Sequence, residues 1–241
     1  MTKFIAIVSG KGGAGKTTAT LNLGQALVQL GRKVLLLEAN LITPNLALQL
    51  GFINPESTVN QFLRKEKNIQ EIIYLHASGL PLIPASPSYT EFQKTNSHNI
   101  TEVFEHLDNL AEFVLVDAPS GLGYEVSQVL KNSDEAVIVV NPNLSSVMDA
   151  LKTIQLAKSC NTTVAGIILN MSNKGKQELK PQEIEEILGH SIIGNVRYHK
   201  KFRKALFKQS PLVHLYPYSR PAKEFKQVAA YLSLEKELRF K

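Results

Sequence analysis

Short apolar runs alternate with amphipathic stretches along almost the whole chain. The runs are four to six residues long and rich in β-branched side chains, a pattern that predicts strands buried on both faces. They lie at residues 4–8, 34–37, 80–83, 113–116, 136–140, 164–169 and 192–196. Apolar residues at helical spacing predict helices between them, at residues 17–30, 100–110, 123–130, 145–158, 181–188, 200–208 and 222–234.

This order of elements predicts the fold class. Strands that alternate with helices form a mostly parallel sheet with helices on both faces, which is the α/β class. The sequence shows no internal repeat, low-complexity tract or linker. We therefore expect one α/β domain over residues 1–241, with the basic part at residues 190–241 inside it.

Glycine and lysine are concentrated directly after the first predicted strand. Residues 10–18 lead into the first predicted helix, and they match the phosphate-loop pattern G-x-x-x-x-G-K-[ST] in the context that it requires. Backbone N–H groups in such a loop turn towards phosphate oxygens, and the helix N-terminus adds positive potential. We expect Lys16 to reach the β- and γ-phosphates of a nucleotide and Thr17 to ligate Mg²⁺. The candidate nucleotide-binding residues are Gly10, Lys11, Gly12, Gly13, Ala14, Gly15, Lys16, Thr17 and Thr18.

A second lysine inside this loop, Lys11, points to a known family. The sequence Lys-Gly-Gly-x-Gly-Lys-Thr-Thr resembles the deviant Walker A motif of the MinD and ParA ATPases, most closely MinD and its archaeal homologues. Residues 116–121, Val-Asp-Ala-Pro-Ser-Gly, resemble the Walker B and switch II segment of that family. Residues 141–150 resemble the MinD segment after the next strand, and the resemblance extends over nearly the whole chain.

The resemblance implies a mechanism and a set of site residues. It implies a P-loop ATPase that binds ATP and Mg²⁺ and forms an ATP-dependent homodimer, in which Lys11 reaches the nucleotide of the partner copy. It further implies that Asp117 supports the metal and that Asn170 hydrogen-bonds adenine. The function implied is a switch that positions or regulates a protein partner in cell division or polar placement. A ParA-like DNA-partitioning ATPase and an ATP-locked scaffold that does not hydrolyse stay open as alternatives.

The chain departs from the family pattern at its second strand. The family typically reads Asp-x-Asp there, whereas this chain reads Glu38-Ala39-Asn40. Asn40 stands where the family has the carboxylate that orients or activates the attacking water, and an asparagine cannot take a proton. We therefore expect slow hydrolysis of ATP at a catalytic site that contains Lys11, Lys16 and Asn40. The alternative is that Glu38, which keeps a carboxylate nearby, compensates and turnover is ordinary.

A second departure lies beside the expected adenine site. MinD relatives often have Ile-Pro-x-Asp there, whereas residues 196–199 read Val-Arg-Tyr-His. We expect Arg197 or Tyr198 to stack on the base instead.

Charge is distributed unevenly along the chain. It has 27 Lys and Arg against 21 Asp and Glu, a net charge of +6, but residues 1–189 carry −3 and residues 190–241 carry +9. Six cations fall within one predicted loop and helix, namely Arg197, Lys200, Lys201, Arg203, Lys204 and Lys208. They indicate either a solvated helix face with the aromatic side chains Tyr198, Phe202 and Phe207 in the core, or a surface for DNA or acidic lipid.

Cysteine usage and the two ends of the sequence bear on location. A single cysteine excludes a disulfide framework and argues against an iron–sulfur site built on paired cysteines. No apolar run of about 18 residues is present, so we expect no transmembrane segment. The tail at residues 234–241 is short and mixed in charge, which argues against a membrane anchor there. We expect a cytoplasmic protein, with peripheral membrane association left open.

Overall fold

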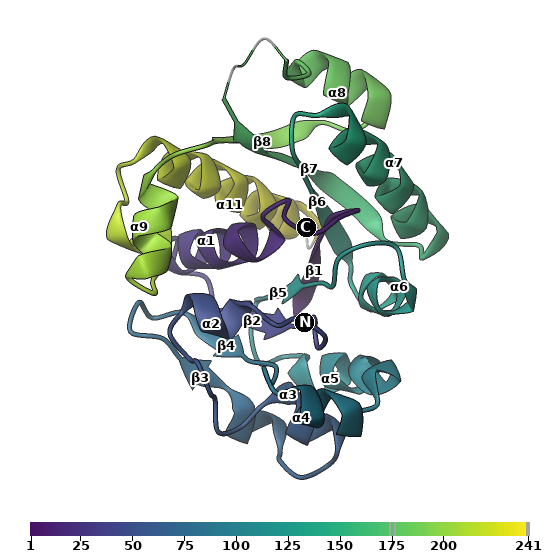
Figure 1. Cartoon of the computed structure of the whole chain (residues 1–241), viewed down its shortest axis with the longest axis vertical. Coiled ribbons are helices and arrows are strands. Elements are labelled where there is room, and N and C mark those ends of the chain that lie inside the picture. The colour runs from purple at the N-terminus through teal and green to yellow at the C-terminus, as the bar shows by residue number, and fades with distance from the viewer. Residues whose placement is uncertain (174, 176, 240–241) are drawn as a thin grey trace.

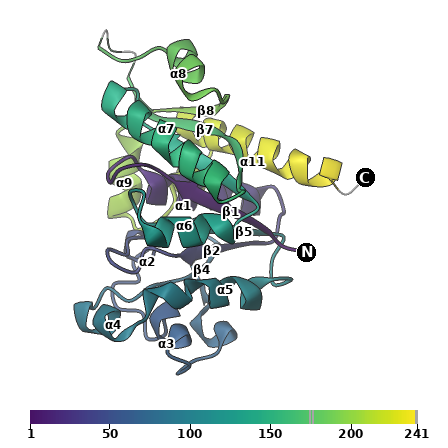
Figure 2. The same cartoon turned by 90° about the vertical axis from the view of Figure 1, so that its right-hand side faces the viewer.

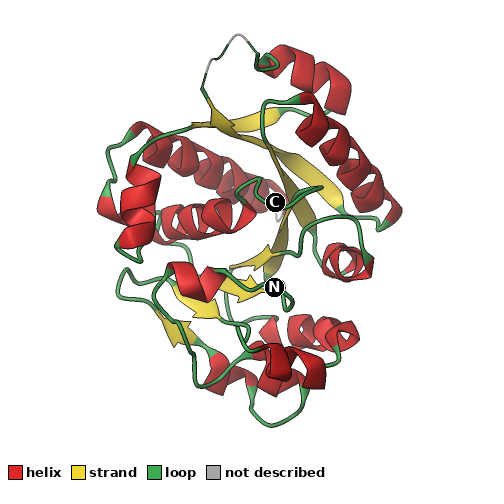
Figure 3. Cartoon of the chain, viewed as in Figure 1, coloured by secondary structure: helices red, strands yellow, loops and turns green. Residues whose placement is uncertain are grey.

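The structure is a computed structural model that describes residues 1–173, 175 and 177–239, the last five of these by their backbone alone. The described residues form an eight-stranded sheet with the order β3-β4-β2-β5-β1-β6-β7-β8. Its strands are β1 (Lys3–Val8), β2 (Val34–Glu38), β3 (Tyr74–Leu75), β4 (Pro81–Ile83), β5 (Phe113–Asp117), β6 (Glu135–Val140), β7 (Thr163–Ser172) and β8 (Ile192–Arg197). Among these strands, β3 pairs antiparallel with β4 and the other neighbours pair in parallel (Figure 3).

Helices cover both faces of this sheet (Figures 1 and 2). One face carries α1 (Lys16–Gln29) packed against α11 (Arg220–Arg239), with α9 (Lys201–Phe207) and α10 (Leu212–Leu215) beside them. The other face carries α5 (Ile100–Leu107), α6 (Tyr124–Lys131), α7 (Leu144–Ser159) and α8 (Pro181–Leu188). Short helices α2 (Leu46–Gln49), α3 (Val59–Leu63) and α4 (Tyr89–Lys94), with the 3₁₀ turns η1 (Ile69–Ile72) and η2 (Ser97–Asn99), complete the described elements.

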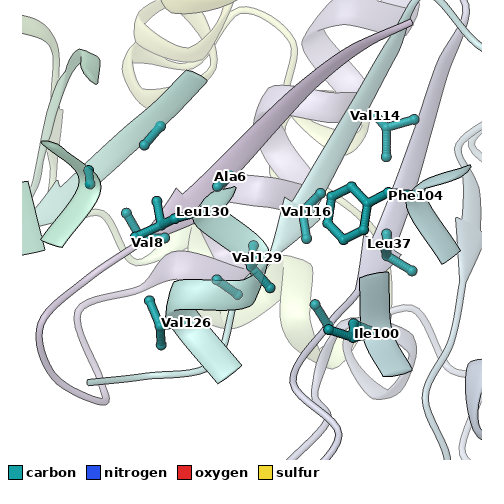
Figure 4. Packing of buried hydrophobic residues seen from close by; sticks show 14 of the residues in the cluster. Ala6, Val8, Leu37, Ile100, Phe104, Val114, Val116, Val126, Val129 and Leu130 are labelled. Carbon is teal, nitrogen blue, oxygen red and sulfur yellow. The ribbon is translucent and has the colours of Figure 1, made fainter. Parts of the chain in front are cut away.

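The central strand β1 divides the apolar interior into two cores. Successive side chains of a strand point to opposite faces of the sheet. Ile5 and Ile7 accordingly join the core beneath α1 and α11, whereas Ala6 and Val8 join the core beneath α6 and α7. Figure 4 shows part of this second core, where side chains of α5 and α6 meet those of β1, β2 and β5. Burial on both faces explains why the strands read as continuous apolar runs.

The predicted fold class and the long predicted elements are confirmed. Each of the seven predicted strands and seven predicted helices is present, with ends that shift by up to five residues. The sequence pattern missed β3, α2, α3, α4 and α10, which have two to six residues each. Elements this short do not complete a recognisable apolar period. Pro81 begins β4, as expected of a proline at the start of a strand.

None of the described helices combines the length and the apolar character that a membrane crossing requires. The side chains of residues 235–241, in the tail that the sequence shows to be short and mixed in charge for a membrane anchor, lie outside the part that the structure describes.

The packing of α11 against α1 gives a first prediction. Phe225 of α11 is among the largest fully buried side chains, in the core beneath these two helices. We expect Phe225→Ala to lower the free energy of unfolding by about 3–5 kcal/mol, because it removes buried apolar area and leaves a cavity. Urea unfolding followed by circular dichroism measures the change. Leu234→Ala, at an exposed position of the same helix, should cost less than about 0.5 kcal/mol, and equal losses in the two variants would contradict this account of the core.

Candidate functional site

The phosphate loop joins the end of β1 to the start of α1 and is tightly packed against its neighbours. Gly15 has a φ of +95°, and a Cβ added there would lie 2.2 Å from the side-chain nitrogen of Asn170. A Cβ on Gly10 would lie 2.5 Å from the backbone of Asp149 in α7. Only glycine fits either position, so these two glycines are fixed by local geometry as well as by any ligand.

Lys16 extends from the first turn of α1 back under the loop. Its Nζ donates to Ser9 Oγ at 3.2 Å and to Ser120 Oγ at 3.3 Å. Burial lowers the pKa of Lys16, and the negative charge of Asp117 opposes that shift. The ammonium group therefore has hydroxyl partners in a site that removes most of its hydration. A phosphate placed in the loop offers the counter-charge that such a buried cation favours.

Asp117 lies at the end of β5, directly beside the start of α1. Its Oδ2 accepts a hydrogen bond from Thr17 Oγ1 at 2.7 Å, and its Oδ1 accepts one from Thr20 Oγ1 at 3.4 Å. Burial raises the pKa of Asp117 to about 6, against the stabilising effect of Thr17, Lys16 and Thr20. One carboxylate and one hydroxyl in contact match a Mg²⁺ site of the phosphate-loop type, in which phosphates and water supply the other ligands. The predicted pair Thr17 and Asp117 is thus brought together.

Glu38 stands next to Asp117 in the sheet, because β2 and β5 are neighbours. It is fully buried, and its two oxygens accept backbone N–H groups from Asn45 at 3.1 Å and Leu46 at 2.7 Å, at the N-terminus of α2. Burial raises the pKa of Glu38 well above its ordinary value, and the charge of Asp117 raises it further. Glu38 therefore holds the start of α2, which is a positioning contact, and its catalytic role stays a prediction.

Asn40 lies two residues beyond β2, in the loop that leads to α2. Its Nδ2 donates to the backbone oxygen of Thr43 at 2.8 Å, and its Oδ1 accepts from Thr43 N at 3.2 Å. The amide therefore closes the loop on itself. Its role towards an attacking water stays a prediction.

Lys11 and Lys16 leave the same loop in different directions. Lys11 is partly exposed, and its Nζ donates to Ser145 Oγ at 3.4 Å, in the first turn of α7. The hydroxyls that hold Lys16 are instead those of Ser9 and Ser120. Lys11 is therefore outside the cradle formed by its own loop.

A pocket of about 240 Å³ opens beside Thr18, and its lining comes from α1, α9, the segment that follows α9, and the ends of β7 and β8. Asn170 reaches it from β7, where a bulge and a φ of +60° at Met171 turn the strand towards the loop. Asn170 Nδ2 donates to the backbone oxygen of Ala14 at 2.8 Å, so the side chain also ties β7 to the phosphate loop. Arg197, the last residue of β8, lines the same pocket, as does Tyr198. The structure thus places the predicted adenine residues in one cavity next to the phosphate loop, although contacts with a base stay a prediction.

The family follows from comparison with known proteins. The ParA family profile, described as NUBPL iron-transfer P-loop NTPase, matches residues 1–233. The chain belongs to the ParA family. An uncharacterized ATP-binding protein of Methanocaldococcus jannaschii is 37% identical over 228 residues, which are 95% of this chain and 86% of that protein.

Solved structures of MinD share the ParA-family fold of this chain. The septum site-determining protein MinD of Pyrococcus horikoshii, complexed with Mg-ADP, has a TM-score of 0.91 at 29% identity over 96% of each chain. MinD of Aquifex aeolicus, solved in a MinC:MinD complex, has a TM-score of 0.86 at 29% identity over 96% of each chain. The predicted resemblance to MinD and ParA ATPases is therefore confirmed, and the chain is an ATP-binding P-loop ATPase of this type.

The ParA-family profile names an iron-transfer protein, but this chain has one cysteine. Cys160 is the C-cap of α7, at the end of that helix far from Ser145 and the phosphate loop, and its Sγ faces the backbone oxygen of Ser127 at 3.7 Å. A helix rises about 1.5 Å per residue, so Cys160 lies roughly 22 Å along the axis from Ser145. An iron–sulfur cluster takes four thiolates, whereas two copies of this chain supply two.

Sequence reasoning missed several polar residues of this ParA-family site. Ser9 and Ser120 bind Lys16, Thr20 binds Asp117, and Asn141 donates to the backbone oxygens of Ala14 and Asn170. Ser9 and Asn141 each follow a predicted buried strand, which was a usable signal, since ligands of α/β proteins bind at the carboxyl ends of strands.

The cations and aromatic side chains in and beside α9 differ in their exposure. Lys200, Arg203, Lys204 and Lys208 are exposed, and Lys201 lies over the Tyr216 ring at 4.9 Å. The alternative that placed the aromatic side chains in the core is right for Phe202, which packs against the apolar core. It is wrong for Tyr198 and Phe207, which are 49% and 89% exposed.

Burial of Asp117 predicts a pH dependence in protein free of nucleotide and magnesium. The folded chain takes up a proton near pH 6 and the unfolded chain near 3.8, the ordinary pKa of the group. Since folding raises this pKa, the free energy of unfolding should rise as pH falls. Between pH 8 and pH 5 we expect wild type to gain on the order of 1 kcal/mol relative to Asp117→Asn, a gain that includes the effect of the Asp117 charge on Glu38.

Urea unfolding of both proteins at the two pH values measures this difference. Asp108→Asn is the matched control, because the pKa of exposed Asp108 lies below its ordinary value. That variant should follow wild type over the same interval. Parallel pH profiles for wild type and Asp117→Asn would show that burial does not raise the pKa of the Asp117 carboxyl.

Proposed function

We propose that this ParA-family chain is a MinD-like switch. It binds Mg-ATP, pairs with a second copy around the nucleotide, and in that state positions or regulates a protein partner. The position of Lys11 is the observation that carries the proposal. A lysine in the phosphate loop that lies outside the cradle of its own loop is available to the nucleotide of a second copy.

Apolar side chains around the loop support a paired state. Leu122, Leu144, Met148 and Met171 are each more than 40% exposed. Leu122 follows Gly121, whose N–H donates to Ser9 at the base of the loop, and Leu144 precedes Ser145, the partner of Lys11. Met148 precedes Asp149, which packs on Gly10, and Met171 contacts the Gly15 position. Exposed apolar groups gathered on one functional surface are typical of a surface that another protein covers.

The chemistry follows from which groups surround the phosphates. Lys16 supplies positive charge from within the loop, and Lys11 of a second copy supplies charge to the same phosphates from outside, as an arginine finger does in other P-loop proteins. Thr17 and Asp117 would hold the Mg²⁺, which neutralises charge that develops on the phosphoryl oxygens. Asn170 holds the side of the loop that faces the base pocket, through its donation to the backbone oxygen of Ala14.

Slow turnover is part of this proposal. Asn40 cannot take a proton, and Glu38 is already engaged at α2, so neither group is free to act as a general base in the observed geometry. A long-lived ATP state suits a switch whose output is binding. It also keeps the ATP-locked scaffold as a second candidate, favoured by the same contacts.

The relatives indicate the kind of partner. Because MinD of Aquifex aeolicus is solved in complex with MinC, we propose that the paired state of this chain likewise binds a regulatory protein.

The turnover rate tests the role of Asn40. We expect Asn40→Asp to accelerate single-turnover hydrolysis of ATP about 100-fold, because it restores a carboxylate that can orient water and accept a proton. An aspartate can still accept the hydrogen bonds from Thr43 that reach Oδ1. It loses the donation from Nδ2 to the Thr43 backbone oxygen, so urea unfolding of the variant is measured beside its rate. Asn68→Asp, at the N-cap of a distant 3₁₀ turn, is the control and should hydrolyse at the wild-type rate. Equal rates for Asn40→Asp and wild type would remove the slow-turnover proposal.

The oligomeric state tests the role of Lys11. Size-exclusion chromatography with light scattering should give a monomer in ADP and a dimer in a slowly hydrolysed ATP analogue. Lys11→Ala should bind the analogue but remain monomeric, because the second copy then lacks the charge that reaches across the interface. Lys33→Ala, at an exposed lysine before β2, should behave as wild type. A wild-type chain that stays monomeric in the analogue would overturn the proposed switch.

A further inference from the structure

Met171 holds a backbone conformation that L residues avoid, at the point where β7 meets the phosphate loop. Its φ of +60° lies in the left-handed region, and the pairing of β7 with β8 shifts register between Asn170 and Ser172. Within the described part of the chain, the other non-glycine residues with a positive φ are polar, namely Lys65, Asn109, Asn161 and Gln209. Glycine adopts this conformation without strain, whereas a methionine has no polar group to bond to its own backbone there. Strain of this kind is concentrated at functional sites.

The side chain of Met171 lies between the phosphate loop and the base pocket. Its Cε is 3.4 Å from the position that a Cβ would take at Gly15. The same side chain lines the pocket of about 240 Å³ to which Asn170 and Arg197 also belong. It is 43% exposed, so the folded chain covers only part of its apolar surface. The uncovered part is available to a ligand in the pocket.

The four apolar side chains exposed around the loop do not all have the same surroundings. Leu122, Leu144 and Met148 lie outside the lining of the base pocket, whereas Met171 is part of it. Pairing with a second copy accounts for the exposure of the first three. Met171 belongs to the wall of the nucleotide site itself.

We propose that Met171 is a binding residue for the base of the nucleotide, and that the strained bulge places it there. Successive side chains of a regular strand point to opposite faces, yet Asn170 and Met171 line one pocket. The left-handed residue removes the alternation at this point. Asn170 is thereby left to hold the loop through Ala14, while the next residue offers a polarizable thioether, which packs favourably against an aromatic ring.

This role rests on nucleotide binding and not on pairing, because one chain holds both the phosphate loop and the base pocket. It can therefore be measured in ADP, where we expect single copies. An adenine that covers Met171 removes apolar surface from water, and that surface is the source of the affinity.

Calorimetric titration of the full chain with Mg-ADP tests the contact. Met171→Ala should bind ADP about tenfold more weakly, because the apolar surface is lost. Met171→Leu keeps a similar apolar volume and should stay within about threefold of wild type. Met148→Ala is the matched control, since Met148 is 44% exposed and lies outside the pocket lining. It should bind ADP as wild type does.

Magnesium pyrophosphate separates the base from the phosphates. It carries the two phosphates of ADP without the base, so Met171→Ala and wild type should bind it equally. Equal losses of affinity for ADP and pyrophosphate would overturn the proposal, because Met171 would then act by packing against the phosphate loop at Gly15.

Met171→Gly separates the contact from the strain. This variant should bind ADP as weakly as Met171→Ala, since both lack the side chain. It should unfold at a higher urea concentration than Met171→Ala, because glycine adopts a φ of +60° without strain. Unfolding at the same concentration would contradict the role given to the bulge.

Two further outcomes would contradict the proposal. Wild-type affinity of Met171→Ala for ADP would remove Met171 from the base pocket. If Met171→Ala and Met148→Ala both kept that affinity but lost the dimer in the ATP analogue, Met171 would belong to the pairing surface instead. Failure of the proposed switch is a different result, because a wild-type chain that stays monomeric in the analogue leaves the comparison in ADP valid.

Discussion

The hydrogen bond between Thr17 and the buried carboxylate of Asp117 fixes the geometry of the phosphate site. It joins the first turn of α1 to the end of β5, and it forms because β5 lies directly beside β1 in the sheet. The same strand order places Glu38 on the other side of Asp117. Two carboxylates and the Lys16 ammonium group are thus held together in a region with little water. Burial moves the pKa of each group towards its neutral form, so this arrangement costs stability and is typical of a functional site.

A second set of contacts connects the phosphate loop to the base pocket. Asn170 and Asn141 both donate to the backbone oxygen of Ala14, and Asn141 also donates to the backbone oxygen of Asn170. The loop is therefore fixed from β7 as well as from α1. A bulge at Met171 directly follows Asn170, so β7 leaves its regular pairing at the point where this side chain meets the loop. Any ligand that moves the loop also acts on the wall of the pocket.

Much of this site could be predicted because its signals are local. The spacing of glycine, lysine and threonine between a strand and a helix fixed the place of Lys16 and Thr17, and Asp117 was marked by its position at the end of an apolar run. The contacts of Glu38 could not be predicted, since they depend on α2, a four-residue helix without a detectable period. The exposure of Phe207 was equally hidden. A phenylalanine at helical spacing is usually buried, and only the packing of α9 shows which side of that short helix faces the core.

The net charge of +6 averages two unlike regions. Asn40, at the position where the resemblance to MinD and ParA ATPases implies a carboxylate, carries no charge and bonds to Thr43 of its own loop. The positive surplus lies instead along α9, where Arg203 and Leu206 line the base pocket while Lys204 and Phe207 do not. One short helix therefore contributes a wall to the nucleotide site and a cationic, apolar surface to the exterior. Because both sides belong to the same short helix, a contact at its outer side and a base in the pocket act on one element. The helix alone connects the two sides, so a connection between them does not require the sheet to rearrange.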